Sequence, residues 1–281
     1  MTRVDKVEKV VKVVKVEKAI IIAAGRGRRL MPYTDEMPKC LVPVDERAIL
    51  GIQVDAFRAH GVRDLVIIRG YLGDVLAARV DEVGGGVRFV ENREWEHNNI
   101  LESLFCAEEE IDGPVLLTYS DIIFTPEVVG RLMSAPGDVC LVIDRAFRDI
   151  YQGRTDHPLP EAEVSDLDER GLVRRVGKRA LPPDDAYGEF IGLAKLSADG
   201  SAWMRQAWRD LRAAYRGREA EPFQRAPSFR AAYLTDMLQH LIDSGHPIHP
   251  VAIDGEWREI DTVQDLERAR AVLGSAKEAW R

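Results

Sequence analysis

Short apolar runs alternate with segments of helical periodicity along the first half of the chain. The apolar runs predict strands buried on both faces of a parallel sheet, at residues 19–23, 65–68, 87–90, 115–119 and 139–143. Helices are predicted between them at 49–60, at 100–110 and from Pro126 onward. This β-α-β alternation predicts a mostly parallel sheet that is covered by helices and connected by right-handed crossovers.

The second half of the chain has a different pattern. Residues 144–183 are rich in charge, glycine and proline, and they predict only one short strand, at 172–176. Further strands are predicted at 187–196, 248–253 and 256–261, and further helices at 201–215, 231–244 and 263–273. Because we find no internal repeat and no strong linker, we expect residues 19–281 to form a single domain.

The first 18 residues differ from the rest in charge. They hold six basic and three acidic residues, a net charge of +3, within a chain whose formal net charge is −8. Val7, Val10, Val11 and Val14 lie at helical spacing. Two interpretations stay open for residues 1–18: a basic amphipathic helix that binds a membrane surface or a partner, and a frayed N-terminal extension.

Composition excludes several classes of protein. The acidic balance argues against a general nucleic-acid binder, and no apolar run approaches the ~20 residues that stable membrane insertion needs. Cys40, Cys106 and Cys140 are odd in number and lack Cys-x-x-Cys spacing, which indicates reduced thiols in the cytoplasm and no zinc site. The sequence leaves a homodimer open.

A basic glycine loop follows the first predicted strand. Residues 23–30 read Ala-Ala-Gly-Arg-Gly-Arg-Arg-Leu, and ligands of parallel α/β sheets bind beyond the carboxyl ends of strands. Gly25 and Gly27 let backbone N–H groups approach an anion closely, and the three arginines add permanent positive charge. The spacing is neither Gly-x-Gly-x-x-Gly nor a P-loop. The predicted ligand is an anionic phosphate.

Three further residues favour phosphoryl chemistry. Pro38 fixes the backbone before Lys39, and a lysine held beside an arginine-lined loop can neutralise charge on a transferring phosphoryl group. Asp121 and Asp261 each end a predicted strand, and two carboxylates at strand ends can share a Mg²⁺. Asp261 could instead cap the helix that follows it.

Together these segments resemble the signature of the nucleotidyltransferases that make sugar- and alcohol-linked nucleoside diphosphates. The resemblance is carried by Ala-Ala-Gly-x-Gly-x-Arg at 23–29 and Pro-Lys-x-Leu at 38–41. Within that superfamily the chain is most similar to the phosphocholine cytidylyltransferase-like branch, which includes phosphonate cytidylyltransferases. The branch's later landmarks match residues 91–104, 119–123, 190–193 and 257–262, so the resemblance covers nearly the whole chain.

The resemblance implies a Rossmann-like mixed sheet of the nucleotide-diphospho-sugar transferase type, with a nucleotide half at 19–143 and a small acceptor-binding subregion within the half at 144–281. It implies an enzyme that uses CTP and Mg²⁺ to transfer CMP to a small phosphate monoester or phosphonate. Arg29 and Lys39 are the expected catalytic residues, and Asp121 and Asp261 the expected metal ligands. The expected nucleotide contacts are Ala23, Ala24, Gly25, Gly27, Arg28, Arg29, Lys39, Tyr71, Asn99, Ser103 and Ser120. The expected acceptor contacts are Lys178, Glu189, Lys195 and Trp257.

Three departures from the family pattern affect these expectations. Arg28 stands where many members have Ser or Thr, Cys40 replaces a common proline, and no aromatic box for a choline ammonium is evident. Two other functions stay open: a sugar- or cyclitol-1-phosphate nucleotidyltransferase that uses another NTP, and a non-catalytic nucleotide-binding regulator on the same fold. Among the weaker candidates, Asn99 could be only a helix start, and Trp257 only a core residue. His157 shows no partner pattern.

Overall fold

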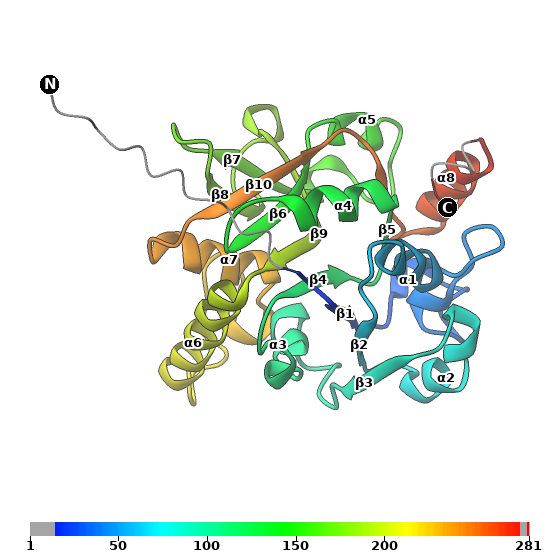
Figure 1. Cartoon of the computed structure of the whole chain (residues 1–281), viewed down its shortest axis with the longest axis horizontal. Coiled ribbons are helices and arrows are strands. Elements are labelled where there is room, and N and C mark those ends of the chain that lie inside the picture. Colours follow the sequence, from blue (N-terminus) through cyan, green and yellow to red (C-terminus); the bar gives the residue numbers. More distant parts are fainter. Residues whose placement is uncertain (1–14, 276–279, 281) are drawn as a thin grey trace, which may run out of the picture.

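The computed structural model describes residues 15–275 and residue 280 (Figure 1). The valines of the predicted basic helix, at 7–14, lie outside the described residues. Val16 is buried, and the first strand, β1 (Lys18–Ala23), already includes Lys18. Among the described residues, the first strand therefore begins at Lys18, the last residue of the segment that the sequence sets apart by charge.

A nine-stranded mixed sheet runs through the molecule, with the strand order β10-β6-β9-β4-β1-β2-β3 and the pair β7 and β8 attached beside β9. All pairings along this order are parallel except those of β9, which is antiparallel to β4 and β6. The strands after β1 are β2 (Asp64–Arg69), β3 (Val87–Glu91), β4 (Val115–Tyr119), β6 (Val139–Asp144), β7 (Glu163–Leu167), β8 (Val173–Lys178), β9 (Gly188–Leu196) and β10 (Ile248–Ile253). A separate antiparallel pair joins β5 (Ile122–Phe124) to β11 (Trp257–Glu259).

Helices cover both faces of the sheet because apolar side chains alternate along its strands. In β1, Ile20 and Ile22 belong to one core, and Ala19 and Ile21 to the other. The first core includes side chains of α3 (Ile100–Phe105), α6 (Ala198–Ala214) and α7 (Leu234–Asp243). The second includes side chains of α1 (Ile49–Ala59), α2 (Gly73–Ala78) and α4 (Pro126–Ser134). A third cluster packs α8 (Val263–Ser275) against α1, and a fourth surrounds α5 (Phe147–Tyr151). Figure 1 shows α6 and α7 toward one end of the molecule and α1, α2 and α8 toward the other.

The predicted fold class is confirmed: the sheet is mixed, mostly parallel and covered by helices on both faces. One predicted helix is shorter than expected, because α3 ends at Phe105 and a 3-10 turn follows over Glu108–Glu110. Three consecutive glutamates oppose the negative C-terminal end of a helix dipole, which accounts for the early end. The sequence analysis did not predict α2, α5, β5 or β7. Within the described part of the chain, no helix is long and apolar enough to cross a membrane.

Candidate active site

A cavity of about 390 Å³ opens at the carboxyl ends of the parallel strands, a volume within the ~300–1,000 Å³ of small-molecule sites. Residues from both halves of the chain line it. β1 and β4 deliver their carboxyl ends there, and β9 delivers its first residues because it runs antiparallel to β4 and β6.

The glycine loop after β1 forms one wall of this pocket and packs against Lys39. Gly27 has a φ of +64°, and a Cβ there would lie 3.0 Å from the Cβ of Lys39. Glycine is therefore required both for the backbone conformation and for the close approach of the lysine stem. Arg28 and Arg29 form a one-turn 3-10 helix that the buried Leu30 anchors, so the guanidinium groups start from a fixed backbone.

Lys39 joins the two predicted metal ligands. Its Nζ lies 2.8 Å from Asp121 Oδ2 and 2.5 Å from Asp261 Oδ1. Asp261 also forms ion pairs with Arg29 and with His157, whose Nδ1 lies 2.8 Å from Asp261 Oδ2. Burial alone lowers the pKa of Lys39, but the two carboxylates outweigh it and raise that pKa above its ordinary value. Burial likewise acts to raise the pKa of Asp261, yet Lys39, His157 and Arg29 hold it far below the usual range.

The short β5–β11 pair brings the two aspartates together from positions 140 residues apart in the chain. Glu259 lies opposite Ile122 in the antiparallel register. One residue beyond the paired segment, Ile260 N–H donates to the carbonyl of Asp121 at 2.8 Å. Asp121 Oδ1 is buried and has no hydrogen-bond partner within the described residues. A carboxylate oxygen that accepts no hydrogen bond and lies beside a second carboxylate suits a hard cation such as Mg²⁺.

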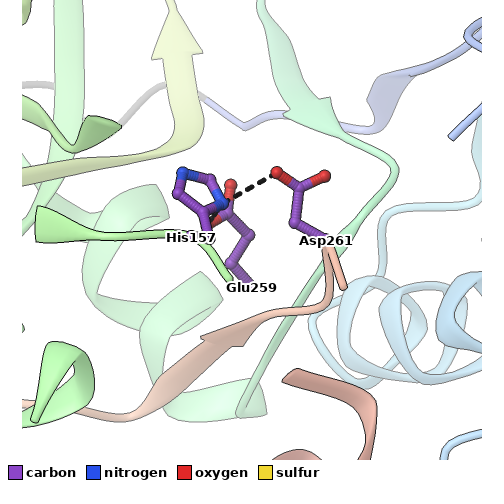
Figure 2. A group of neighbouring side chains, drawn as sticks. All are labelled: His157, Glu259 and Asp261. Atoms are coloured by element: carbon purple, nitrogen blue, oxygen red, sulfur yellow. Dashed lines mark ion pairs between the residues drawn. The ribbon is translucent and has the colours of Figure 1, made fainter. Parts of the chain in front are cut away.

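Figure 2 shows a group that shares Asp261 with this pair: the side chains of Glu259 and Asp261 both lie toward the Nδ1 edge of the His157 ring. The ligand atoms of the three residues lie within 4.8 Å of one another, a spacing that could hold a metal ion. However, Arg154 donates to Glu259 at 2.7 Å and lies 3.1 Å from His157 Nδ1. Cations of the protein thus contact both carboxylate groups, but Asp121 keeps a buried oxygen, Oδ1, without a hydrogen-bond partner in the described residues, so Asp121 and Asp261 fit a metal ion better.

A second cluster of charged side chains lies on the strands β7, β8 and β9. Glu163 and Lys178 are directly opposite each other in the β7–β8 register, and Glu189 lies on β9 beside β7. Glu163 accepts hydrogen bonds from the hydroxyls of Tyr119 and Thr235, each at 3.0 Å, and burial raises its pKa to about 7. Side chains from three strands thus share one side of the cavity.

The structure places most of the predicted site residues in this pocket. Those that line it are Ala23, Ala24, Gly25, Gly27, Arg28, Arg29, Lys39, Asn99, Ser103, Ser120, Asp121, Lys178, Glu189, Trp257 and Asp261. Two of them hold the wall in place: Asn99 Nδ2 donates to the carbonyl of Ala231 at 2.8 Å, and the Ser103 hydroxyl accepts from Asn92 at 2.8 Å. Trp257 is a buried core residue whose indole N–H donates to Asp144 at 2.8 Å.

Two predicted residues do not line the pocket. Lys195 is buried near the far end of β9, opposite Leu116 and Cys140, and its ammonium donates to the carbonyl of Ala135. The antiparallel direction of β9 explains this position, because the end of β9 that holds Lys195 lies beside the amino ends of β4 and β6. This position does not fit the expected acceptor contact of Lys195, which we correct. The Tyr71 hydroxyl donates to the carbonyl of Thr34 at 2.9 Å, and its ring lies edge-on to Trp95 of the pocket wall, so its contact with a nucleotide stays a prediction.

Sequence reasoning missed several residues that line the pocket, notably His157, Glu163 and Glu259. Glu259 was detectable, because alternation along a strand puts it on the same side as Trp257 and Asp261. His157 lies in a loop of the least patterned region and carries no such signal. The predicted reduced cysteines agree with the structure, in which Cys40, Cys106 and Cys140 are free thiols.

Comparison with known proteins identifies the family of the chain. A family model described as "MobA-like NTP transferase domain" matches residues 19–279. The chain is 30% identical to a CTP:phosphoglutamine cytidylyltransferase from Campylobacter jejuni, over 89% of this chain and 97% of that protein. It is 26% identical to a 2-aminoethylphosphonate cytidylyltransferase from Lancefieldella rimae, over 88% of this chain and 89% of that one.

A solved structure supports the fold assignment. A CTP:phosphocholine cytidylyltransferase from Streptococcus pneumoniae matches with a TM-score of 0.67 and 21% identity. The match covers 92% of this chain and 100% of that one. At this identity the likeness shows a shared fold.

Proposed function

Because the chain belongs to the family of MobA-like NTP transferase domains, a nucleotidyltransferase family, we propose that it transfers CMP from CTP to a small phosphate monoester or phosphonate and releases pyrophosphate. The observation that carries this proposal is the contact of Lys39 with Asp121 and Asp261 beside the glycine loop. The cytidylyltransferase relatives, matched over nearly their whole length, support CTP as the donor.

In this proposal the loop at 23–29 and Lys39 hold the triphosphate. Backbone N–H groups of the loop and the guanidinium of Arg29 are suited to bind phosphate oxygens, and Lys39 stabilises the charge that develops as pyrophosphate leaves. An ionised oxygen of the acceptor attacks the α-phosphorus, a new P–O bond forms, and the bond to the β-phosphate oxygen breaks. Since that acceptor oxygen is already ionised at neutral pH, the reaction requires no general base.

Asp121 and Asp261 are the residues that would hold Mg²⁺. Asp121 Oδ1, which has no partner among the described residues, and the oxygen-only donor set fit this ion. When bound, Mg²⁺ would supply charge neutralisation on the triphosphate.

The remaining assignments belong to the same proposal. Residues 19–143 would bind the nucleotide, and residues 144–281 the acceptor. The three free thiols suit a reducing compartment, so we propose the cytoplasm as the location. The possible homodimer stays a prediction, which light scattering on the purified chain would test.

A pyrophosphate-release screen tests the proposed function. The full chain is incubated with Mg²⁺, each of the four NTPs, and a panel of phosphonates, phosphocholine, phosphoethanolamine and sugar-1-phosphates. We expect release with CTP and a small phosphate or phosphonate. Turnover only with a sugar-1-phosphate and another NTP would overturn the choice of substrates. Nucleotide binding without turnover on any acceptor would favour a non-catalytic regulator.

A further inference from the structure

A groove of about 720 Å³ lies outside the candidate active site, lined by α3, the end of α6 and the segment 216–230 that follows α6. Its lining residues differ from those of the active pocket with one exception, since Asn98 lines both cavities. Asn92, which lines the groove, donates to the hydroxyl of Ser103, which lines the active pocket, at 2.8 Å. The segment 92–106 thus forms a wall between two separate cavities.

Five arginines line this groove: Arg93, Arg209, Arg212, Arg216 and Arg230. The first two form ion pairs with Glu91 and Glu108. Within residues 15–275, the other three form no ion pair, and their guanidinium groups donate no hydrogen bond. Two of them come from the end of α6 and the residues after it, and the third comes from the 3-10 turn Phe229–Ala231. Guanidinium groups stay charged and match the geometry of phosphate oxygens, so the groove offers three cations to an anion.

The carboxylates of the groove do not occupy these three arginines by direct contact. Besides Glu108, the acidic side chains that line it are Glu94, Glu102 and Glu219, and none of them forms an ion pair within the described residues. Glu219 Oε1 accepts from the backbone N–H of Gly217 at 3.0 Å. Backbone N–H groups, and then Arg230 and Arg212, lower the pKa of Glu219. Two of the free guanidinium groups, which come from different elements, therefore act on the same part of the groove.

A buried indole N–H is a second, independent indication of a ligand. Trp208 lines the groove, is 3% exposed, and stacks on Phe105 and Phe229 with ring centres 4.3 and 5.6 Å apart. Its Nε1 is buried and has no hydrogen-bond partner among the described residues. The Arg212 guanidinium lies 5.6 Å from the centre of the same ring. A buried donor without an acceptor is costly, and an oxygen of an anion that binds Arg212 would supply the acceptor.

We propose that this groove is a second binding site, for a diphosphate group that contacts Arg212, Arg216 and Arg230 and accepts a hydrogen bond from the Trp208 indole. A diphosphate group offers charged oxygens on two phosphorus atoms, so it can pair with several guanidinium groups at once, whereas orthophosphate offers one compact group. The same group occurs in free pyrophosphate and in nucleoside diphosphates. This inference goes beyond the proposed function, because the site lies outside the active pocket and its ligand need not react.

Indole N–H signals in the NMR spectrum of the ¹⁵N-labelled full chain report the two cavities separately. The Trp208→Phe variant identifies the signal of the groove, and Trp257 supplies a signal from the active pocket. Pyrophosphate, CDP and orthophosphate are titrated in EDTA, so that no turnover contributes. We expect pyrophosphate to shift the Trp208 signal to saturation, with an affinity about 10-fold higher than that of orthophosphate, as one more hydrogen bond between charged groups provides. An equal affinity for CDP would assign the site to nucleoside diphosphates, and a response to pyrophosphate alone would assign it to the free anion.

Three variants test the assignment by charge. Arg216→Gln should weaken the affinity measured at Trp208 about 10-fold, because it removes one charged donor. Glu219→Gln should strengthen this affinity about two- to fivefold, because it removes a like charge and keeps the oxygen that accepts from Gly217. Arg28→Gln, the matched loss of a guanidinium group in the active pocket, should leave it unchanged.

A Trp208 signal that does not shift would overturn the proposal, as would equal affinities for pyrophosphate and orthophosphate. These two results come from the wild-type chain and do not depend on how a variant folds. A Trp208 response that weakens in Arg28→Gln and is unchanged in Arg216→Gln would also overturn it, because the signal would then follow binding in the active pocket.

Discussion

Replacing Lys39 with methionine tests whether its ammonium occupies the place of a divalent cation. Its Nζ contacts Asp121 and Asp261 at 2.8 and 2.5 Å, and the side chain is almost fully buried. Lys39→Met keeps most of the stem that packs against Gly27 and removes only the charge. Within residues 15–275, Asp121 forms no ion pair other than the one with Lys39, whereas Asp261 retains those with Arg29 and His157.

The structure sets the size of the expected loss of stability. Removing one partner of a buried ion pair costs about 3–5 kcal/mol, because the other charge stays buried and uncompensated. Here Asp261 keeps its ion pair with Arg29 and its 2.8 Å contact with His157 Nδ1, and the Asp121 side chain is 27% exposed. We therefore expect the free energy of unfolding in EDTA to fall by about 2–3 kcal/mol, below most of that range.

A divalent cation should reverse this loss in the variant. Without the ammonium, both carboxylates are free to bind metal, so the metal affinity of the nucleotide-free protein should rise. A ligand at about 100 times its Kd stabilises the folded state by about 2.7 kcal/mol, which matches the loss. In the wild-type protein Lys39 competes with the metal, and the same ion concentration should add much less stability.

Urea unfolding in EDTA and in increasing Mn²⁺ measures both effects. Lys195→Met is the matched control, because Lys195 is an equally buried lysine that donates to the carbonyl of Ala135 outside the pocket. Mn²⁺ should stabilise the Lys195→Met variant no more than it stabilises the wild-type protein. The reasoning is refuted if Lys39→Met is as stable as the wild type in EDTA, or if Mn²⁺ stabilises both proteins equally.

Three further predictions concern other parts of the site. Asp121→Asn should lower pyrophosphate release by at least about 100-fold while the circular dichroism spectrum is unchanged; near-wild-type turnover would contradict the metal assignment. The contribution of Glu163 to the stability of the protein should fall as pH rises. Burial raises the pKa of Glu163 in the folded state from 4.5 to about 7, so the folded state holds the proton more tightly than the unfolded state does. The stability of Glu163→Gln relative to wild type should therefore rise by up to about 3 kcal/mol between about pH 4 and 8 in urea unfolding, and a flat difference would disprove it. Gly192→Ala should lower the melting temperature by several degrees, since Gly192 has a φ of +85° and a Cβ there would lie 2.3 Å from the Tyr119 ring; an unchanged melting temperature would contradict this.

The side of the pocket formed by the glycine loop and Asp121 could be predicted because its residues follow strands that the apolar pattern identifies. The loop at 23–29 comes directly after β1, and Asp121 comes two residues after β4. Position at a strand end then implies a shared edge of the sheet. The position of Asp261 beside Asp121 could not be predicted in the same way. It depends on the β5–β11 pair, and the sequence indicates only one of these two strands.

The side of the pocket formed by β7, β8 and β9 was harder to predict because its residues depend on pairings between distant polar strands. β7 reads Glu-Val-Ser-Asp-Leu, and its polar residues are buried by contacts with β8 and β9 that no local pattern reveals. His157 lies in a loop whose position is set by Arg154, which binds Asp265 at 2.6 Å across 111 residues. Such contacts follow from the assembled fold, so local propensity carries no information about them.

The direction of β9 decides which of its charged residues lines the pocket. Alternation along 189–195 places Glu189, Ile191, Leu193 and Lys195 on one face, and this pattern is the same whichever way the strand runs. In the sheet β9 runs antiparallel to β4 and β6. Glu189, near the start of β9, therefore pairs with Asp144 at the carboxyl end of β6, and Lys195 pairs with Cys140 near the amino end of β6. A parallel β9 would exchange these positions and bring a lysine into the pocket. The acidic character of this side of the pocket thus follows from one antiparallel strand in a mostly parallel sheet.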